Sequence, residues 1–339
     1  MEKYAVLSAV NRGSFWERLC HLYMKTGDYI DMENLENRHV VYAKVFLSDI
    51  RNQYAALLES QLWQDYLSQV TCSVIGQAPL DGSKINVLVC TSDSADSHAL
   101  CRVRLSGDDV AGMDIYVQSV MLFEKFVTHA HLTGGTAQPV GLRVWVYVAD
   151  VDGSLSAVER ARDDVFMRYG IEIDERRVAV TCVGGTTHMD GVLVALDYIS
   201  FGRQAKAVVP LHIESGNSGG GSRIHACTYG IGLDLGYGLR VDLPAFVPSA
   251  ASGADMSQLD VRQYTGQLLG DMGVRLKSYG LTMNHVRCFV AYLRDFSDYS
   301  DVDRLLSMAF PYVPHAIIGA KGADCRRPVM IECVAVKPV

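Results

Sequence analysis

The chain repeats one pattern of apolar and polar positions three times. In each copy a helical apolar stripe precedes an apolar strand that ends in aspartate, and a second helix and two further strands follow. The three strands are VVYAKVFLSD at 40–49, LRVWVYVAD at 142–150 and VRCFVAYLRD at 286–295. This repetition predicts three related α+β units, with the function located where the units meet.

The first copy spans residues 1–95 and shows no obvious leading pair of strands, so it is predicted to be a partial unit. Ser14 is a preferred helix N-cap residue, and the apolar residues after it keep a helical spacing as far as Gly27. A second helix is predicted over about 53–68. Strands follow at 71–76 and 84–91, separated by the turn sequence Pro79-Leu80-Asp81-Gly82.

The second copy spans 96–210 and the third spans 211–339. In the second copy the pattern predicts a leading strand at 100–105, helices over 114–132 and 154–169, and strands at 178–184 and 191–201. In the third copy it predicts a leading hairpin at 224–235 and 238–247, helices over 260–279 and 297–308, and strands at 315–321 and 328–336.

Each complete unit is therefore read as β-β-α-β-α-β-β. Two helices cover one face of such a sheet and leave the other face exposed. Three of these faces can be buried together around a shared axis, which predicts a pseudo-threefold packing within one chain. The aspartates that end the three repeated strands, Asp49, Asp150 and Asp295, recur in every copy. We therefore interpret them as caps of the following helices rather than as catalytic groups.

Composition and charge narrow the classes of function that the chain could have. The chain has 339 residues, 49% of them apolar and 20% charged, which is typical of a soluble protein with a large core. Its net charge of -7 argues against nucleic-acid binding, because neutralising phosphates requires clustered Lys and Arg. No apolar run reaches membrane-spanning length, the N-terminal segment lacks the features of a secretory signal, and the nine cysteines form no C-x-x-C pair. These features predict a cytoplasmic protein, and no motif indicates a metal or another cofactor.

The second and third copies carry a family resemblance. The third contains FVAYLRDFSDYSDVDRLLSMAFPYVPHA (289–316) and VMIECVAV (329–336); the second contains VWVYVADVDGSLSAVERARDDVFMRYG (144–170) and VTCVGGTTHMDGVLVALDYIS (180–200). These segments resemble the Rid superfamily (YjgF/YER057c/UK114), often described as "endoribonuclease L-PSP". The resemblance covers 100–339 and, more weakly, 14–91. The tandem layout and Cys325-Arg326 ahead of Glu332 are similar to the chorismatase branch.

The resemblance implies a chorismate-mutase-like fold with ligand sites in the clefts between units. Family members hydrolyse reactive imines or enamines: an arginine holds the substrate carboxylate and a glutamate activates water. Glu332 stands at the position of that glutamate, the second copy has Asp197 there, and the first copy has apolar residues. The position of the family arginine falls near Ile317 in the third copy, near Val180 or Thr181 in the second and near residues 71–73 in the first. None of these residues is basic.

This departure indicates a diverged site. A small Ser-Gly-Thr segment of tandem relatives is also replaced, by Pro244-Ala245-Phe246, and Phe246 is expected to fill space that a ligand might use.

Glu332 is the candidate catalytic residue. It lies in an apolar strand, where a carboxylate needs a partner or a raised pKa. The alternative is an ion pair with Arg326 or Arg327 that closes an interface. Arg326, Cys325 and Arg327 are the candidate substrate-binding residues, because arginines hold carboxylates and a thiol can hydrogen-bond to them. The alternative for the two arginines is a solvated turn.

Three functions remain open. The first is hydrolysis of an imine, enamine or enol ether of a small carboxylate metabolite, with Glu332 as acid or base. The second is a non-catalytic ligand-binding or partner protein that keeps the fold without the chemistry. The third, endoribonuclease action, is disfavoured by the negative charge. The assembly is expected to be a monomeric pseudo-trimer or a homo-oligomer of such chains, and the third copy is the expected place of an active cleft.

Overall fold

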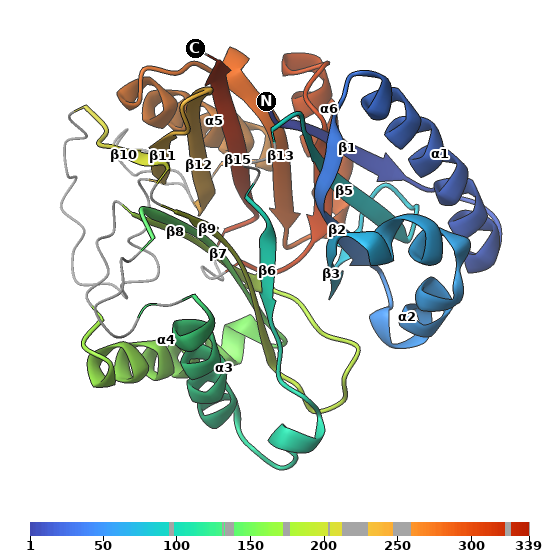
Figure 1. The fold of residues 1–339 in the computed structure, drawn as a ribbon. Helices are drawn as coiled ribbons and strands as arrows, with labels where there is room; N and C mark the ends of the chain where they lie inside the picture. The colour runs from blue at the N-terminus through green and yellow to red at the C-terminus, as the bar shows by residue number, and fades with distance from the viewer. Residues whose placement is uncertain are drawn as a thin grey trace.

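The computed structural model describes residues 1–94, 98–130, 132, 139–171, 177–202, 204–211, 230–246, 259–322 and 327–338. Within them the chain forms three β-sheets, each with helices packed on one side only (Figure 1). The expected α+β architecture is confirmed. Among the described residues no helix is both long and apolar enough to cross a membrane.

The first unit forms a four-stranded sheet in the order β1-β5-β2-β3. Its elements are β1 (Lys3–Ser8), α1 (Phe15–Leu35), β2 (His39–Leu47), α2 (Ile50–Glu59), β3 (Thr71–Gly76) and β5 (Ile85–Ser92). A short π-helix (Leu62–Tyr66) and a 3₁₀ turn (Leu67–Gln69) follow α2, and a two-residue strand, β4 (Ala78–Pro79), leaves the unit. β1 pairs antiparallel with β5 and is a leading strand that the sequence analysis did not predict.

Two helices of this unit differ from the prediction. α1 continues past Gly27 to Leu35. Gly27 does not end the helix. Its lack of a side chain lets Tyr66 pack against α1, because a Cβ at this position would lie 2.7 Å from the Tyr66 hydroxyl oxygen. The helix expected over 53–68 begins at Ile50 and ends at Glu59, where Ser60 is extended and its hydroxyl donates to the Leu57 carbonyl at 2.6 Å.

The second unit repeats the arrangement in the strand order β6-β9-β7-β8. Its elements are β6 (Leu100–Val103), α3 (Ile115–His129), β7 (Gly141–Val148), α4 (Val151–Arg168), β8 (Val178–Gly184) and β9 (Val194–Phe201), with a 3₁₀ turn at Asp108–Val110.

The third unit has a seven-stranded sheet in the order β10-β11-β12-β15-β13-β14-β4. Its elements are β10 (Lys206–Val208), β11 (Ile231–Asp234), β12 (Gly238–Phe246), α5 (Val261–Ser278), β13 (Val286–Leu293), α6 (Tyr299–Ala309), β14 (His315–Gly319) and β15 (Val329–Pro338), with 3₁₀ turns at Met283–His285 and Phe296–Asp298. The leading hairpin is present as β11 and β12. The last strand of this sheet, β4, belongs by sequence to the first unit.

The three repeated aspartates are caps, as predicted. Asp49 accepts a hydrogen bond from the Asn52 backbone N–H and Asp150 from that of Gly153, each at the start of the following helix. Asp295 accepts one from the Ser297 N–H at 2.9 Å, at the start of a 3₁₀ turn. Their recurrence is therefore explained by local backbone hydrogen bonding.

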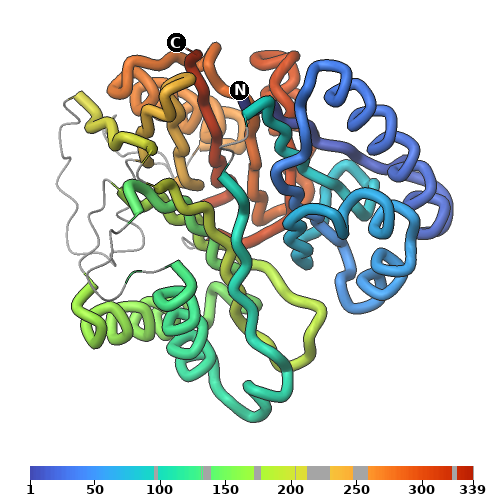
Figure 2. Tube along the Cα trace, in the orientation of Figure 1, coloured from blue at the N-terminus to red at the C-terminus, as the bar shows by residue number. Residues whose placement is uncertain are grey.

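Apolar side chains form one core under each pair of helices and a further core at the centre. The central core contains residues of all three sheets, among them Tyr42, Leu88, Ile199, Val290 and Ile318. Figure 2 shows the three units as lobes around this common centre. The faces that the helices leave uncovered are thus buried against one another.

Backbone hydrogen bonds also join the units at the ends of the strands that follow the second helix of each unit, which are β3, β8 and β14. The Gly76 N–H donates to the Thr186 carbonyl at 2.8 Å, and the Gly184 N–H donates to the Lys321 carbonyl at 2.7 Å. In the third unit Gly319 occupies the matching position at the end of β14, next to β4. A Cβ on Gly76 would lie 2.7 Å from Ile50 Cγ2 and would contact the Thr186 hydroxyl, so glycine permits this close approach.

Replacing Gly76 with alanine should therefore destabilise the protein. We expect Gly76→Ala to lower the free energy of unfolding by about 1–3 kcal/mol, the usual cost of overpacking. Gly266→Ala is the matched control: Gly266 lies within α5 with open space around its Cα, so alanine should raise stability by up to about 1 kcal/mol through helix propensity. Denaturant unfolding measures both, and equal effects would contradict the close-approach argument.

Candidate functional site

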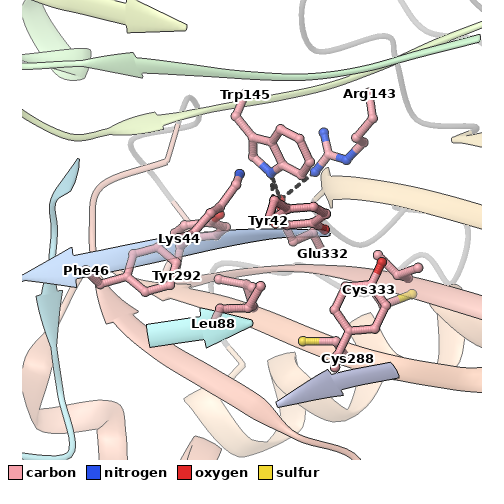
Figure 3. A pocket seen from close by; sticks show the side chains of 13 residues that line it. Tyr42, Lys44, Phe46, Leu88, Arg143, Trp145, Cys288, Tyr292, Glu332 and Cys333 are labelled. Atoms are coloured by element: carbon pink, nitrogen blue, oxygen red, sulfur yellow. Dashed lines mark hydrogen bonds and ion pairs between the residues drawn. The ribbon is translucent and has the colours of Figure 1, made fainter. Parts of the chain in front are cut away.

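A small pocket lies at the centre, where the three inner sheet faces meet. β2 of the first unit contributes Tyr42 and Lys44, β7 of the second contributes Arg143 and Trp145, and β15 of the third contributes Glu332 (Figure 3). Further apolar and sulfur-containing side chains complete the lining: Tyr4, Phe46, Leu88, Cys288, Val290, Tyr292, Cys333 and Val334. The volume is about 30 Å³, which is room for about two water molecules.

Glu332 lies on the inner face of β15, opposite Val290 of β13, and only 7% of its surface is exposed. Its carboxylate accepts hydrogen bonds from three side chains of the second unit: Arg143 Nη2 at 2.6 Å, Thr181 Oγ1 at 2.7 Å and Trp145 Nε1 at 2.9 Å. The burial expected from the sequence is present. The acid of the third unit is thus held by donors of the second.

The arginine beside Glu332 is Arg143, which sequence reasoning missed. The alternative interpretation of Glu332 was an ion pair with Arg326 or Arg327, and Arg326 lies outside the described residues. The ion pair that the structure describes is with Arg143, 189 positions away in the sequence. The residues at the position of the family arginine are not basic, as the sequence indicated. The guanidinium comes instead from strand β7. The one available signal was a charged residue inside the apolar strand LRVWVYV.

Arg143 is itself almost fully buried, with 1% of its surface exposed. Besides Glu332, its Nη2 donates to Thr181 Oγ1 at 2.7 Å, and its Nη1 donates to the carbonyls of Val144 and Ala179 at 2.8 and 3.1 Å. The guanidinium is thus fixed by backbone and side-chain acceptors. Such pre-positioning suits an arginine that recognises a carboxylate.

Of the other candidate residues, only Arg327 lies in the described part of the chain. Cys325 and Arg326 lie outside the described residues. Arg327 is half-buried just before β15 and is not part of the pocket lining. Phe246 was expected to fill space that a ligand might use, and this prediction is wrong. Phe246 is buried in the helix-covered core of the third unit, with the Arg275 guanidinium 4.2 Å from its ring centre.

The replaced segment has a structural role instead. The pairing of β12 with β15 shifts register between Leu243 and Phe246, at the proline that cannot donate to the ladder. There the Ala245 N–H donates to Thr181 Oγ1 at 2.9 Å. Thr181 therefore links β12 to the Glu332 cluster across the boundary between the second and third units.

Strand pairing places Leu88, Asp197 and Glu332 at one equivalent position. They lie opposite Lys44, Trp145 and Val290 respectively. The structure therefore confirms that the position of Glu332 in the third unit is occupied by Asp197 in the second and by an apolar residue, Leu88, in the first.

Asp197 has surroundings that parallel those of Glu332. It is fully buried and accepts from Ser73 Oγ of the first unit at 2.6 Å, from Arg104 Nη2 at 2.7 Å and from the Tyr147 hydroxyl at 3.2 Å. Burial alone would raise the pKa of Asp197, but Arg104, Lys44 and the Ser73 hydrogen bond together hold it below its ordinary value. Asp197 is therefore a stable buried anion at neutral pH.

Lys44 is the second residue that the sequence analysis missed. It lies in the middle of β2 with 5% of its surface exposed. Its Nζ is 3.2 Å from the centre of the Trp145 ring and donates to the Tyr147 hydroxyl at 3.2 Å. Burial lowers the pKa of Lys44 to about 7. A lysine inside an apolar strand, VVYAKVFL, was the signal for it.

One buried ion pair, between Arg240 and Glu2, crosses the boundary between the third and first units. Arg240, 1% exposed, donates to both oxygens of Asp242 at 2.7 and 2.9 Å and also pairs with Glu2. The Tyr4 hydroxyl donates to Glu2 at 2.8 Å. Within the described ranges, no three or more His, Cys, Asp or Glu side chains are grouped so that they could hold a metal ion.

No family model and no curated protein matches this sequence. Among solved structures, a chorismatase aligns with 87% of this chain and 92% of its own, with a TM-score of 0.56 and 14% identity. A putative translation initiation inhibitor from Vibrio vulnificus (20% identity, TM-score 0.30) aligns over 38% of this chain and 100% of its own. A YjgF/YER057c/UK114 family member from Mycobacterium tuberculosis (17%, TM-score 0.29) aligns over 38% and 98%. As the resemblance in the sequence predicted, the chain has the fold of chorismatase.

Proposed function

We propose that the protein binds a small carboxylate metabolite in the central pocket and hydrolyses its imine, enamine or enol-ether group, with Glu332 as the acid or base. One observation carries this proposal: Glu332 of the third unit and Arg143 of the second face one internal pocket and contact each other at 2.6 Å. A carboxylate-binding group and a proton-transfer group are thus available at one place, as this chemistry requires.

The charges at the pocket favour an anionic ligand. Arg143 and a protonated Lys44 supply two positive charges, and Glu332 supplies one negative charge. A ligand carboxylate would compete with Glu332 for Arg143 and would also be attracted to Lys44. Displaced from Arg143, the Glu332 carboxylate would be available to take a proton from water at the moment when the ligand is bound.

Imine hydrolysis at this site would then proceed in two steps. Glu332 takes a proton from water while the water oxygen bonds to the imine carbon. That proton then passes to the imine nitrogen, which gives a carbinolamine. The hydroxyl proton of the carbinolamine passes to the nitrogen as the carbon–nitrogen bond breaks, and ammonia and a 2-oxo acid leave. Trp145 and Thr181 would keep the Glu332 carboxylate oriented toward the pocket.

The volume of the pocket limits the size of the substrate. About 30 Å³ holds only about two water molecules, so a three-carbon imino acid with six heavy atoms requires the lining side chains to move apart, and the ring of chorismate requires a larger movement. The same small, buried pocket offers no surface for an RNA strand, so we do not propose the endoribonuclease function.

A second candidate function is ligand binding without chemistry. Glu332 already accepts three hydrogen bonds, two of them from neutral donors and one from Arg143. While these donors hold the carboxylate, it is not available to take a proton from water. If the ligand leaves this cluster intact, the protein would bind a small acid and release it unchanged.

Glu332→Gln tests the catalytic assignment. The amide keeps the shape but cannot take up a proton, so we expect turnover to fall about 10²–10⁴-fold, the usual contribution of general acid–base catalysis. The substrates are 2-iminopropanoate, generated from alanine by an amino-acid oxidase and followed by semicarbazide trapping, and chorismate, followed by pyruvate release.

Glu33→Gln is the matched control, because Glu33 is a buried, ion-paired glutamate of α1 with 1% exposure that does not line the pocket. It should retain wild-type turnover. Full activity in Glu332→Gln would remove Glu332 from the mechanism. Binding without turnover in the wild-type protein would favour the second candidate.

Pyruvate binding tests the competition for Arg143. Because Glu332 occupies the guanidinium, its neutralisation in Glu332→Gln should tighten pyruvate binding by about tenfold, equivalent to about 1.4 kcal/mol. Calorimetric titration measures this, and pyruvamide, which carries no charge, should show no such gain. Weaker pyruvate binding by the variant would mean that Glu332 assists the ligand instead of competing with it.

A further inference from the structure

We propose that Lys44 is a covalent carbonyl-binding residue, whose amine condenses with a small aldehyde or 2-oxo acid in the central pocket to form an imine. This inference goes beyond the proposed hydrolysis and does not depend on it, since it requires no proton transfer by Glu332. It rests on the position of the amine, on its surroundings and on its neighbours for proton transfer.

The position of Lys44 gives the amine access to the pocket. β2 presents Tyr42, Lys44 and Phe46 on its inner face, and all three line the pocket. Figure 3 shows the Lys44 side chain directed toward the Trp145 ring. The amine therefore lies beside the space that a ligand of a few heavy atoms would occupy.

The fold does not explain why a lysine stands here. The equivalent positions in the second and third units carry Trp145 and Val290, so the central core accepts apolar side chains at this point. Burying an amine in such a core is costly, and an apolar residue would avoid the cost. A lysine retained there is better explained by its chemistry than by packing.

The surroundings of the amine keep it reactive. Among the described residues no carboxylate lies within 4 Å of Nζ, whose contacts are the Tyr147 hydroxyl and the Trp145 ring. Every charged group that affects it lies farther away: Asp197 on β9 and Glu332 on β15 favour the ammonium form, while Arg143 on β7 and Arg104 oppose it. Burial outweighs these and brings the pKa to about 7, so about half of the amine is neutral at pH 7.

Imine formation requires proton transfers, and the neighbours can provide them. The Lys44 amine donates to the Tyr147 hydroxyl, which donates to Asp197 at 3.2 Å. The neutral amine bonds to the carbonyl carbon, and one amine proton passes to the carbonyl oxygen to give a carbinolamine. The second amine proton passes to the hydroxyl oxygen as the carbon–oxygen bond breaks, and the oxygen leaves as water. No oxidant or reductant is consumed.

Reductive trapping tests this proposal. The full-length protein is incubated with glyoxylate, or with pyruvate, and sodium cyanoborohydride, and its peptides are then analysed by mass spectrometry. We expect a reduced adduct at Lys44 at pH 7, formed at least tenfold faster than at the exposed residues Lys206 and Lys337, which serve as internal controls. Lys44→Met and Lys44→Arg should lose this adduct and keep those at the exposed lysines.

The pH profile gives a second readout. Trapping at Lys44 should be half-maximal near pH 7, whereas exposed lysines react increasingly up to about pH 10.4, where an ordinary lysine loses its proton. Adducts confined to exposed lysines, or a Lys44 profile that matches theirs, would overturn the proposal. Neither result bears on whether Glu332 catalyses hydrolysis.

Thermal unfolding of Lys44→Met distinguishes a reactive lysine from one that the fold requires. Between pH 7 and about 10.4 the unfolded chain binds a proton that folded Lys44 has lost, so wild-type stability rises with pH across this window. Methionine removes this dependence. The melting temperature of Lys44→Met should therefore exceed that of the wild type at pH 6, and the difference should shrink by pH 10. A variant that is less stable than the wild type at every pH would show that the fold needs Lys44 and would contradict the proposal.

Discussion

The structure depends on the burial of three inner sheet faces against one another. Each sheet has helices on one side only, so its other side would expose apolar residues such as Tyr42, Ile199 and Val290. Apolar burial stabilises by about 25 cal/mol per Å², and in one chain the faces have only each other as partners. This constraint brings strands that are distant in sequence into contact and determines which side chains meet at the centre.

The polar groups of that centre follow from the same constraint. A charge buried among apolar faces must find a partner, and Glu332 and Asp197 each have an arginine together with neutral donors. The pair formed by Arg143 and Glu332 crosses from one unit to the next, so it also fixes how those units are placed. Lys44 is accommodated differently: within the described part of the chain no carboxylate lies within 4 Å of its amine, and burial lowers its pKa to about 7.

Divergence of the copies makes the pocket asymmetric. Tyr42, Arg143 and Cys288 precede Lys44, Trp145 and Val290 by two positions on equivalent strands, and all six line the pocket. A symmetric trimer would present the same group three times. In a single chain each copy supplies a different one, so an acid, an arginine and an amine can be gathered at one place.

The sequence by itself determined most of the strands and helices, the helix caps and the strand that carries Glu332, whereas β1 and the ends of α1 and α2 were not predicted. Strand periodicity and the Asp49, Asp150 and Asp295 caps are local, because they depend on residues a few positions apart. Only the tertiary structure decided the partners. Arg143 and Glu332 are 189 positions apart, and Lys44 reaches Tyr147 over 103. Nothing in a local pattern encodes such distances; they arise when apolar faces are buried together and the polar side chains on them must be satisfied across the boundaries.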